Sequence, residues 1–221
     1  EFIKTNVYGA QNIIEGAIES NVKKVIALST DKAAAPINLY GASKLCSDKL
    51  FTAANNIKGK KNISFSIVRY GNVFGSRGSI VPFFLEQMKK KMTLTITDKR
   101  MTRFNISLED GVNMVLWSIK NSKGGEIFVP KLPSFRVTDL INAMSVNLKT
   151  KIIGIRPGEK IHEDMITNAD AQNTIDLGRY FAILPDSQQL KKKYPKAKRV
   201  KNNFYYNSGN NEKFLSVPEL R

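Results

Sequence analysis

"KKVIALSTDKAAAPINLYGASK", residues 23–44, joins a short apolar run to a segment with helical character. The run over residues 23–30 has no polar interruption after its two lysines, which is typical of a strand buried on both faces in a parallel sheet. Asn38 can cap the next helix, which the sequence predicts over residues 39–56. The stretch therefore predicts a strand, a turn and a helix, the unit from which α/β proteins are built.

The flanking segments continue this alternation. Residues 5–21 predict a helix, and residues 63–75, "ISFSIVRYGNVFG", predict a second strand that enters a glycine-containing loop. The apolar residues that share one face of the first helix are Val7, Ala10, Ile14, Ala17 and Ile18. Helix, strand, helix, strand is the order of a doubly wound parallel sheet, so we predict the α/β class.

The pattern changes after about residue 78. The sequence predicts helices over residues 79–92, 107–121 and 137–148 and strands over residues 126–130 and 151–159. Ser107 and Asp110 have the spacing of a helix-capping pair. We expect a smaller mixed lobe over residues 79–221, packed as one unit with residues 1–78, because no low-complexity linker separates them.

Composition narrows the class of protein. With 221 residues, 42% hydrophobic and 24% charged, the chain can bury a globular core. No apolar stretch approaches the length of a membrane span, and the N-terminus does not resemble a signal peptide. Cys46, the one cysteine, cannot form an internal disulfide and is expected to be a small buried residue on a helix. We therefore predict a cytoplasmic protein without membrane partners.

The net charge of +16 raises the question of an anionic partner. Most of the basic residues are lysines spread along the chain, and the dense run is "LKKKYPKAKRVKNNFYYN", residues 190–207. We interpret the run as a solvated surface. Because it interleaves aromatic and basic residues as single-strand binders do, a basic nucleic-acid-binding module remains the alternative, together with attraction of a phosphorylated substrate.

Tyr40 and Lys44 are i and i+4 neighbours on the predicted helix. An ammonium group beside a phenol stabilises the phenolate, so the pKa of the Tyr40 phenol would fall from about 10 toward the range useful for proton transfer. The spacing is common by chance. Its placement favours a functional site, because the helix follows a strand whose end carries Ser29 and Thr30.

These residues, together with Asn6 on the preceding predicted helix, resemble the extended short-chain dehydrogenase/reductase family. The resemblance implies a Rossmann-type sheet and a nicotinamide cofactor. In such enzymes the residue matching Tyr40 exchanges the proton of a sugar hydroxyl during hydride transfer, and the one matching Thr30 orients that hydroxyl. The residue matching Lys44 holds the nicotinamide ribose.

The segments "STDKAAAPINLYGASK", "RYGNVFGSRGSIVPFF", "MTRF" and "RPGEKIHEDM" are similar to the inverting UDP-N-acetylglucosamine 4,6-dehydratases, which begin pseudaminic acid biosynthesis. Related dehydratases carry an acidic residue at the place of Lys32. Removal of water from a sugar needs an acid and a base beyond the tyrosine. Asp31 suits the acid and Lys32 the base, provided that burial or neighbours shift each pKa toward neutrality.

Adjacent residues of a regular strand point to opposite faces, so Asp31 and Lys32 reach one sugar only if the strand has ended. A surface turn is the usual place for an Asp-Lys pair. At the carboxyl end of a strand, where open α/β sheets bind ligands, we favour a functional pair.

The resemblance extends to the second half of the chain. It implies that Asn72 contacts the substrate near its phosphates and that Tyr70, Gly71 and Val73 border the nicotinamide. Arg77 and Arg103 suit a diphosphate or uridine, and Arg156 and Glu159 would bind the uridine end. His162, the one histidine, lacks partners at ligand spacing, so no metal site is indicated.

The chain contains no G-x-G-x-x-G fingerprint. The resemblance implies that roughly the first hundred residues of such an enzyme, including the pyrophosphate loop, are absent. Residues 1–78 would then be the C-terminal part of the dinucleotide-binding domain and residues 79–221 mainly a nucleotide-sugar-binding lobe, with one side of the sheet exposed.

We expect NADP as cofactor, with NAD as the alternative, a UDP-sugar substrate and a homo-oligomer. A retaining dehydratase and a nucleotide-sugar 4-epimerase are the alternative enzymes.

Overall fold

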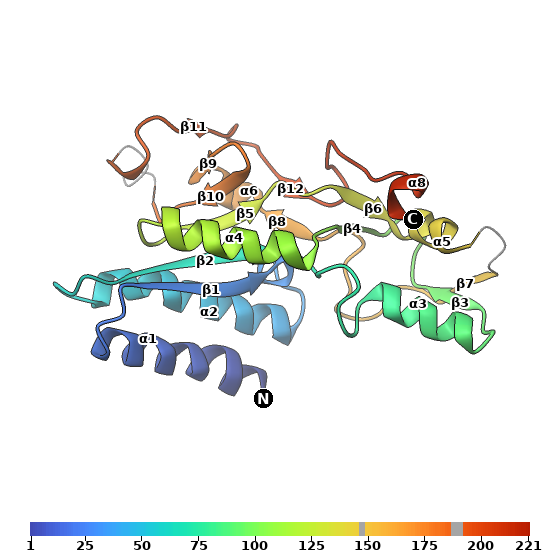
Figure 1. Ribbon diagram of the computed structural model, residues 1–221, viewed down its shortest axis with the longest axis horizontal. Helices are drawn as coiled ribbons and strands as arrows, with labels where there is room; N and C mark the ends of the chain where they lie inside the picture. The colour runs from blue at the N-terminus through green and yellow to red at the C-terminus, as the bar shows by residue number, and fades with distance from the viewer. Residues whose placement is uncertain (146–148, 187–191) are drawn as a thin grey trace. The chain divides into compact units, whose positions relative to one another are not determined.

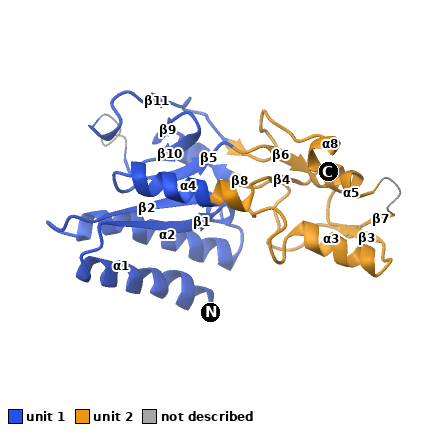
Figure 2. Cartoon of the chain, viewed as in Figure 1, with its two compact units in different colours: residues 1–70, 112–131, 165–205 blue, residues 71–111, 132–164, 206–221 orange. Residues whose placement is uncertain are grey.

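The computed structural model describes residues 1–145, 149–186 and 192–221. The chain divides into two compact units, shown in different colours in Figure 2. Unit 1 comprises residues 1–70, 112–131 and 165–205, and unit 2 comprises residues 71–111, 132–164 and 206–221. Each unit is therefore assembled from segments that are distant in the sequence.

A six-stranded sheet with the order β1-β2-β5-β10-β9-β11 forms the centre of unit 1. The first three strands are parallel, and each of the other three runs antiparallel to its neighbours. The strands are β1 (Lys24–Thr30), β2 (Ser64–Tyr70), β5 (Ile127–Pro130), β10 (Tyr180–Ile183), β9 (Thr174–Asp176) and β11 (Lys198–Arg199). The predicted α/β class with a parallel sheet is confirmed.

Helices cover both faces of this sheet (Figure 1). The helices α1 (Gly9–Glu19) and α2 (Leu39–Ile57) lie on one face, and α4 (Leu108–Asn121) lies on the other. No helix in the described part of the chain is both long and apolar enough to cross a membrane.

Strand β2 contacts both helical layers because its side chains alternate. Phe65 packs on Phe51 of α2, whereas Val68 belongs to a buried cluster with Met114 of α4 and Phe128 of β5. A strand between two layers has no face in solvent, so residues 65–69 are all buried, and the polar Ser66 and Arg69 among them are hydrogen-bonded.

The helices predicted over residues 5–21, 39–56 and 107–121 are confirmed to within two residues, with one local change, whereas the helix predicted over residues 79–92 ends at Lys89. The segment before α1 is a π-helix, η1 (Lys4–Tyr8), and Ala10, Ile14 and Ala17 are the buried residues of α1. The Asn38 side chain caps α2 by accepting a hydrogen bond from the Gly41 backbone N–H at 2.8 Å. Ser107 caps α4 by accepting from the Asp110 N–H at 3.0 Å.

The prediction that residues 23–30 are buried on both faces is wrong. Ser29 is the one buried residue of β1, and Leu28 is 53% exposed. Within the described residues β1 lies at the edge of the sheet and pairs with β2 alone, so no strand covers its other side. An exposed edge agrees with the expectation that one side of the sheet is open.

The prediction that Cys46 is buried is also wrong. Cys46 lies on α2 as expected, but its side chain is exposed. The buried positions of this helix include Ser47, Phe51 and Ala54. Because each residue turns the helix by about 100°, a position directly before Ser47 points away from that face.

Unit 2 contains short ladders. The strands β3 (Leu94–Ile96) and β7 (Thr150–Ile152) are parallel, and β4 (Thr102–Phe104) and β6 (Ser134–Arg136) are antiparallel. Its core includes Phe84, Leu94, Phe135 and Leu140. Its helices are α3 (Ile80–Lys89), α5 (Val137–Met144) and α8 (Val217–Leu220). Three further short elements are β8 (Asp164–Ile166), α6 (Asn168–Ala171) and β12 (Tyr206–Asn207).

The helix predicted over residues 137–148 is confirmed as α5, although residues 146–148 lie outside the described residues. The strand predicted over residues 151–159 is shorter, because β7 ends at Ile152 and the chain then turns.

We predict that Phe128→Ala lowers the free energy of unfolding by about 3–5 kcal/mol, because the mutation leaves a cavity at the centre of unit 1. Phe128 is 0% exposed and contacts the Trp117 ring edge-on. As a control, Leu116→Ala on α4, where the side chain is 59% exposed, should change it by less than about 0.5 kcal/mol. Urea denaturation followed by circular dichroism measures both. Equal effects of the two mutations would contradict the assignment of this core.

Candidate active site

Strand β1 ends at Thr30, and the chain continues in a 3₁₀ turn, η2 (Asp31–Ala33). Thr30 is extended and accepts a hydrogen bond from the Lys32 backbone N–H at 3.4 Å, which caps the turn. The strand therefore breaks where the predicted chemistry of Asp31 and Lys32 requires it to break.

Asp31 is buried, with 2% of its surface exposed. Its Oδ1 accepts from the Thr30 hydroxyl at 2.8 Å and from the Lys32 ammonium at 3.0 Å. The Lys32 side chain keeps 30% of its surface exposed. A surface turn would leave both charges in water, so the burial of Asp31 contradicts that interpretation. The pair combines a shielded carboxylate with a cation that solvent or a ligand can reach.

Helix α2 presents Tyr40 and Lys44 beside the end of β1. The Lys44 ammonium donates to the Leu28 carbonyl oxygen of β1 at 2.8 Å. Burial lowers the pKa of Lys44, and the nearby Asp48 carboxylate opposes that effect. The Tyr40 ring lies 5.4 Å from the Phe2 ring, centre to centre, in an edge contact. The predicted tyrosine and lysine thus lie at the carboxyl end of a parallel strand, where such sheets bind ligands.

Asn6 contacts α2 directly. Its side-chain amide donates to the Ser43 hydroxyl at 2.9 Å, and that hydroxyl donates to the Tyr40 carbonyl oxygen at 2.8 Å. The π-helix η1 is therefore joined to the first turn of α2. Ser43 was not predicted from the sequence, although it lies between the tyrosine and the lysine of the Y-x-x-x-K pattern.

At the end of β2, Tyr70 lies next to Thr30, because the two residues are register partners of the parallel pair. Burial raises the pKa of the Tyr70 phenol, so this group keeps its proton at neutral pH. The structure thereby brings together, within unit 1, the predicted residues Asn6, Thr30, Asp31, Lys32, Tyr40, Lys44 and Tyr70.

The other predicted residues belong to unit 2. Gly71 is buried, Asn72 and Arg77 are exposed, and Val73 forms a bridge with Ile106. Asn72 and Arg103 both line a small pocket of about 50 Å³. Two residues predicted to bind one substrate thus share a cavity.

The Arg103 guanidinium holds the loop that follows residue 155. It donates to the carbonyl oxygens of Ile161 and Lys160 at 3.0 and 3.2 Å and lies 3.5 Å from the Glu163 carboxylate. The Glu159 carboxylate is 3.9 Å away and also accepts from the Arg156 backbone N–H at 3.3 Å. Arg103 and Glu159 therefore lie close together, and Arg156 joins them through its backbone while its side chain is exposed.

His162 lies beside this cluster. Its Nδ1 is 2.8 Å from the Thr102 hydroxyl. Burial lowers the pKa of His162, and the neighbouring Arg103 guanidinium lowers it further. In residues 1–145, 149–186 and 192–221, no three His, Cys, Asp or Glu side chains gather in a way that could hold a metal ion.

In the basic run 190–207, whose first two residues lie outside the described residues, three of the four aromatic residues pack against the protein and Tyr205 is exposed. The Tyr194 hydroxyl donates to the Glu126 carboxylate at 2.8 Å, Phe204 packs on Phe181, and Tyr206 is buried. Bases stack on exposed rings, and among these four aromatic residues Tyr205 alone is exposed, so the aromatic support for the nucleic-acid alternative is reduced to one ring. The exposed β11 agrees with the predicted lysine-rich surface.

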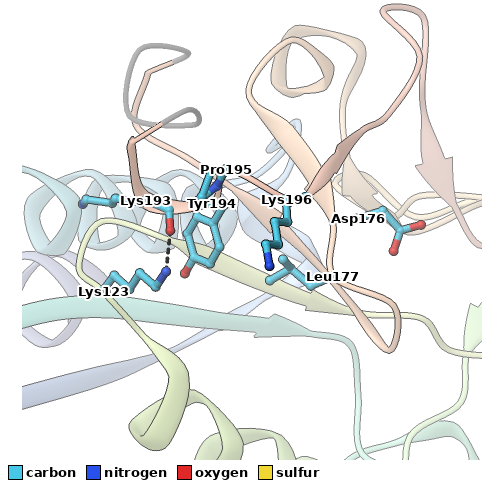
Figure 3. Close-up of a pocket in the computed structure, with 8 residues that line it drawn as sticks. Lys123, Asp176, Leu177, Lys193, Tyr194, Pro195 and Lys196 are labelled. Carbon is cyan, nitrogen blue, oxygen red and sulfur yellow. Dashed lines mark hydrogen bonds between the residues drawn. The ribbon is translucent and has the colours of Figure 1, made fainter.

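A pocket of about 420 Å³ adjoins this run (Figure 3). It is lined by Lys123, Lys193, Tyr194 and Lys196, among others. The Lys123 ammonium donates to the Lys193 carbonyl oxygen and lies 4.4 Å from the centre of the Tyr194 ring. Lys123 is therefore held by contacts with Lys193 and Tyr194 within unit 1.

Residues 1–185 match the sequence profile of a family described as polysaccharide biosynthesis protein. The chain belongs to this family. It is 52% identical over its whole length to the UDP-N-acetylglucosamine 4,6-dehydratase (inverting) of Campylobacter jejuni subsp. jejuni serotype O:23/36 (strain 81-176), of which it covers 69%. The resemblance to inverting dehydratases is thereby confirmed.

Two further comparisons set this chain in context. It is 42% identical to the UDP-glucose 4-epimerase of Rickettsia canadensis (strain McKiel), over 86% of this chain and 57% of the relative. The X-ray structure of Pen from Bacillus thuringiensis is 38% identical and matches with a TM-score of 0.89, over 99% of this chain and 67% of that one.

Gly41 is a second residue that sequence reasoning missed. A Cβ atom at this position would lie 2.3 Å from the Lys32 carbonyl oxygen and 3.1 Å from the Pro36 Cβ. Glycine therefore lets the first turn of α2 approach the Asp31–Lys32 turn. The signal was available in the sequence, because a glycine directly after Tyr40 is unfavourable for a helix unless packing requires it.

We predict that Gly41→Ala destabilises the protein by about 1–3 kcal/mol, because the added methyl group overlaps a backbone oxygen. Gly16→Ala on α1 is the matched control, since no heavy atom lies within 4 Å of its added Cβ. It should stabilise the helix by about 0.5–1 kcal/mol. Urea denaturation compares the two, and a shift of the same sign in both would refute the close approach.

We predict that neutral His162 contributes stability that acid removes. The pKa of folded His162 lies below the unfolded value of about 6.5, so the unfolded chain takes up the proton first as the pH falls. The contribution is complete above about pH 6.5 and is lost as the pH falls through the folded pKa.

The measurement is the free energy of unfolding between about pH 7 and pH 5, for the wild type and for His162→Gln. The wild type should lose more stability than the variant over this range. Parallel curves would show that His162 has the same proton affinity in both states.

Proposed function

We propose that this chain carries the catalytic part of an inverting UDP-N-acetylglucosamine 4,6-dehydratase. The observation that carries the proposal is the buried Asp31, paired with Lys32 in a turn that begins where β1 ends, beside Tyr40 and Lys44 on α2. The 52% identity to a relative with that name supports it.

A nicotinamide cofactor fits the residues present. A phenol and an ammonium group at the carboxyl end of a parallel strand are the donors that a nicotinamide ribose and a reacting hydroxyl need. Tyr40 and Lys44 would hold the cofactor, with Tyr70, Gly71 and Val73 bordering it. When bound, NADP supplies the capacity to accept hydride from C4 of the sugar and to return it to C6. NAD is the alternative cofactor.

The chain's own residues move the protons. Tyr40 removes the proton of the C4 hydroxyl, Thr30 orients that hydroxyl, and the Lys44 ammonium stabilises the phenolate. The resulting ketone makes the C5 proton acidic. Transfer of a proton from the Lys32 ammonium to the Asp31 carboxylate along their 3.0 Å hydrogen bond would leave an amine and a carboxylic acid. The Lys32 amine then removes the C5 proton, and the Asp31 carboxylic acid protonates the departing 6-hydroxyl, so that water leaves. Return of a proton to the opposite face of C5 gives inversion.

The nucleotide end of the substrate falls to residues of unit 2. We assign the phosphates to Asn72 and Arg77, and the uridine end to Arg103, Arg156 and Glu159. Residues 1–78 would serve the dinucleotide and residues 79–221 mainly the nucleotide sugar. The product would enter pseudaminic acid biosynthesis in the cytoplasm, and we expect the enzyme to be a homo-oligomer.

A UDP-glucose 4-epimerase is the second candidate, because relatives with that name are 41–42% identical. An epimerase moves a hydride to and from C4 and needs no acid and base for C5 and C6. The Asp31–Lys32 pair therefore favours the dehydratase.

We predict that the product of the complete gene, incubated with NADP and UDP-N-acetylglucosamine, forms a 4-keto-6-deoxy sugar with inverted C5. Proton NMR identifies this product. Asp31→Asn and Lys32→Met should each lower kcat by about a hundredfold or more, because each removes a proton-transfer group. Lys23→Met, at an exposed lysine before β1, is the control and should leave kcat unchanged.

Formation of a 4-epimer without loss of water would support the second candidate. Absence of turnover by folded, cofactor-loaded wild type would refute the dehydratase assignment.

A further inference from the structure

A buried ion pair in unit 1 lies beside the candidate site and has no part in the proposed proton transfers. Arg69 of β2 donates from Nη2 to Oδ2 of Asp48 on α2 at 3.0 Å, with 3% and 2% of the two side chains exposed. The Ser29 hydroxyl of β1 donates to the same oxygen at 2.8 Å. One carboxylate oxygen thus connects α2 to two strands of the sheet.

The members of this network are neighbours of the site residues. Asp48 follows Lys44 by four residues and Tyr40 by eight, so all three share one face of α2. Ser29 directly precedes Thr30, and Arg69 directly precedes Tyr70. Any shift of α2 along the sheet that moves Tyr40 relative to Thr30 must therefore break this network.

Stability alone does not account for the pair. Desolvation of two charges opposes their attraction, and apolar residues of similar volume often stabilise a core equally well or better. The contact of Phe51 on Phe65 is apolar and sets no precise height or rotation of α2. The Asn55 side chain also exchanges hydrogen bonds with the Phe65 backbone, but it lies near the C-terminal end of α2, about four turns beyond Tyr40. Directional hydrogen bonds to a single oxygen do set both.

We infer that Asp48 and Arg69 are positioning residues that fix Tyr40 and Lys44 at their distance from Thr30 and the Asp31–Lys32 turn. The kinetic consequence rests on the proposed function. The Lys44–Leu28 hydrogen bond is the contact through which the fixed helix meets β1. The Arg69 Nη1 donates to the Met165 carbonyl oxygen at 3.1 Å, which holds the arginine in place.

The test replaces both charges, with Asp48→Leu and Arg69→Met in one double variant of the complete gene product. We expect the single change Asp48→Asn to lower the thermal midpoint of unfolding, because Arg69 loses its charged partner. The double variant should recover most of the lost midpoint, because neither charge is left buried alone. In the double variant kcat should stay about a hundredfold below wild type while KM changes by less than about twofold, since the reacting groups are misplaced.

Asp176→Asn is the matched control, because Asp176 pairs with Lys131 at 2.8 Å in the same unit, away from α2. It should keep the wild-type kcat. Recovery of both the midpoint and kcat in the double variant would overturn the inference and leave the pair a structural role. If the double variant does not fold, Asp48→Glu, which keeps the charge on a longer side chain, should fold and show the same loss of kcat; a wild-type kcat would overturn the inference.

Hydrogen–deuterium exchange separates this inference from the proposed function. Residues 28–33 and 38–45 should exchange faster in the double variant than in wild type or Asp176→Asn. If wild type makes no dehydrated product, the proposed function fails, and exchange alone decides on positioning. Wild-type exchange rates in both segments of the double variant would then overturn the inferred positioning role.

Discussion

The break of β1 at Asp31 is the constraint on which the candidate site depends. A strand that continued would place Asp31 and Lys32 on opposite faces, whereas the 3₁₀ turn lets Lys32 fold back onto the Asp31 carboxylate. The turn needs room, and Gly41 provides it because a side chain there would overlap the Lys32 carbonyl oxygen. The end of the strand, the turn and the start of α2 therefore form one piece of structure.

Two buried carboxylates support this piece, and each has its own cation. Asp31 pairs with Lys32, and Asp48 pairs with Arg69. Burial disfavours every one of these charges, so their hydrogen-bonded pairing is what makes the arrangement possible. The two pairs differ in exposure: Lys32 is partly open, whereas Arg69 is enclosed. A partly open pair can exchange a proton with a ligand, and an enclosed pair can only hold position.

Local sequence signals predicted most of the helices and strands, and the resemblance supplied the candidate site residues. Alternation of apolar runs gave the strands and helices, and the side chains of Asn38 and Ser107 gave helix starts that the structure confirms. The errors concern neighbours that no local pattern reveals. Leu28 is exposed because β1 lies at an edge, and the ion pair of Arg69 with Asp48, 21 residues away, was not predicted although Arg69 lies in a predicted strand. Partners distant in sequence decide both cases.

The charged residues at the end of β1 distinguish a dehydratase from a 4-epimerase better than overall sequence identity does. A relative named as an epimerase is 42% identical over 86% of this chain, and one named as a dehydratase is 52% identical over all of it, so identity alone separates the two names only weakly. Transfer of hydride at C4 needs the tyrosine and lysine that such a scaffold supplies. Loss of water needs two further proton-transfer groups beside the same sugar, and a buried carboxylate touching a half-open ammonium is a pair of that kind. An epimerase would bury those charges without using them, which is why their burial favours the dehydratase.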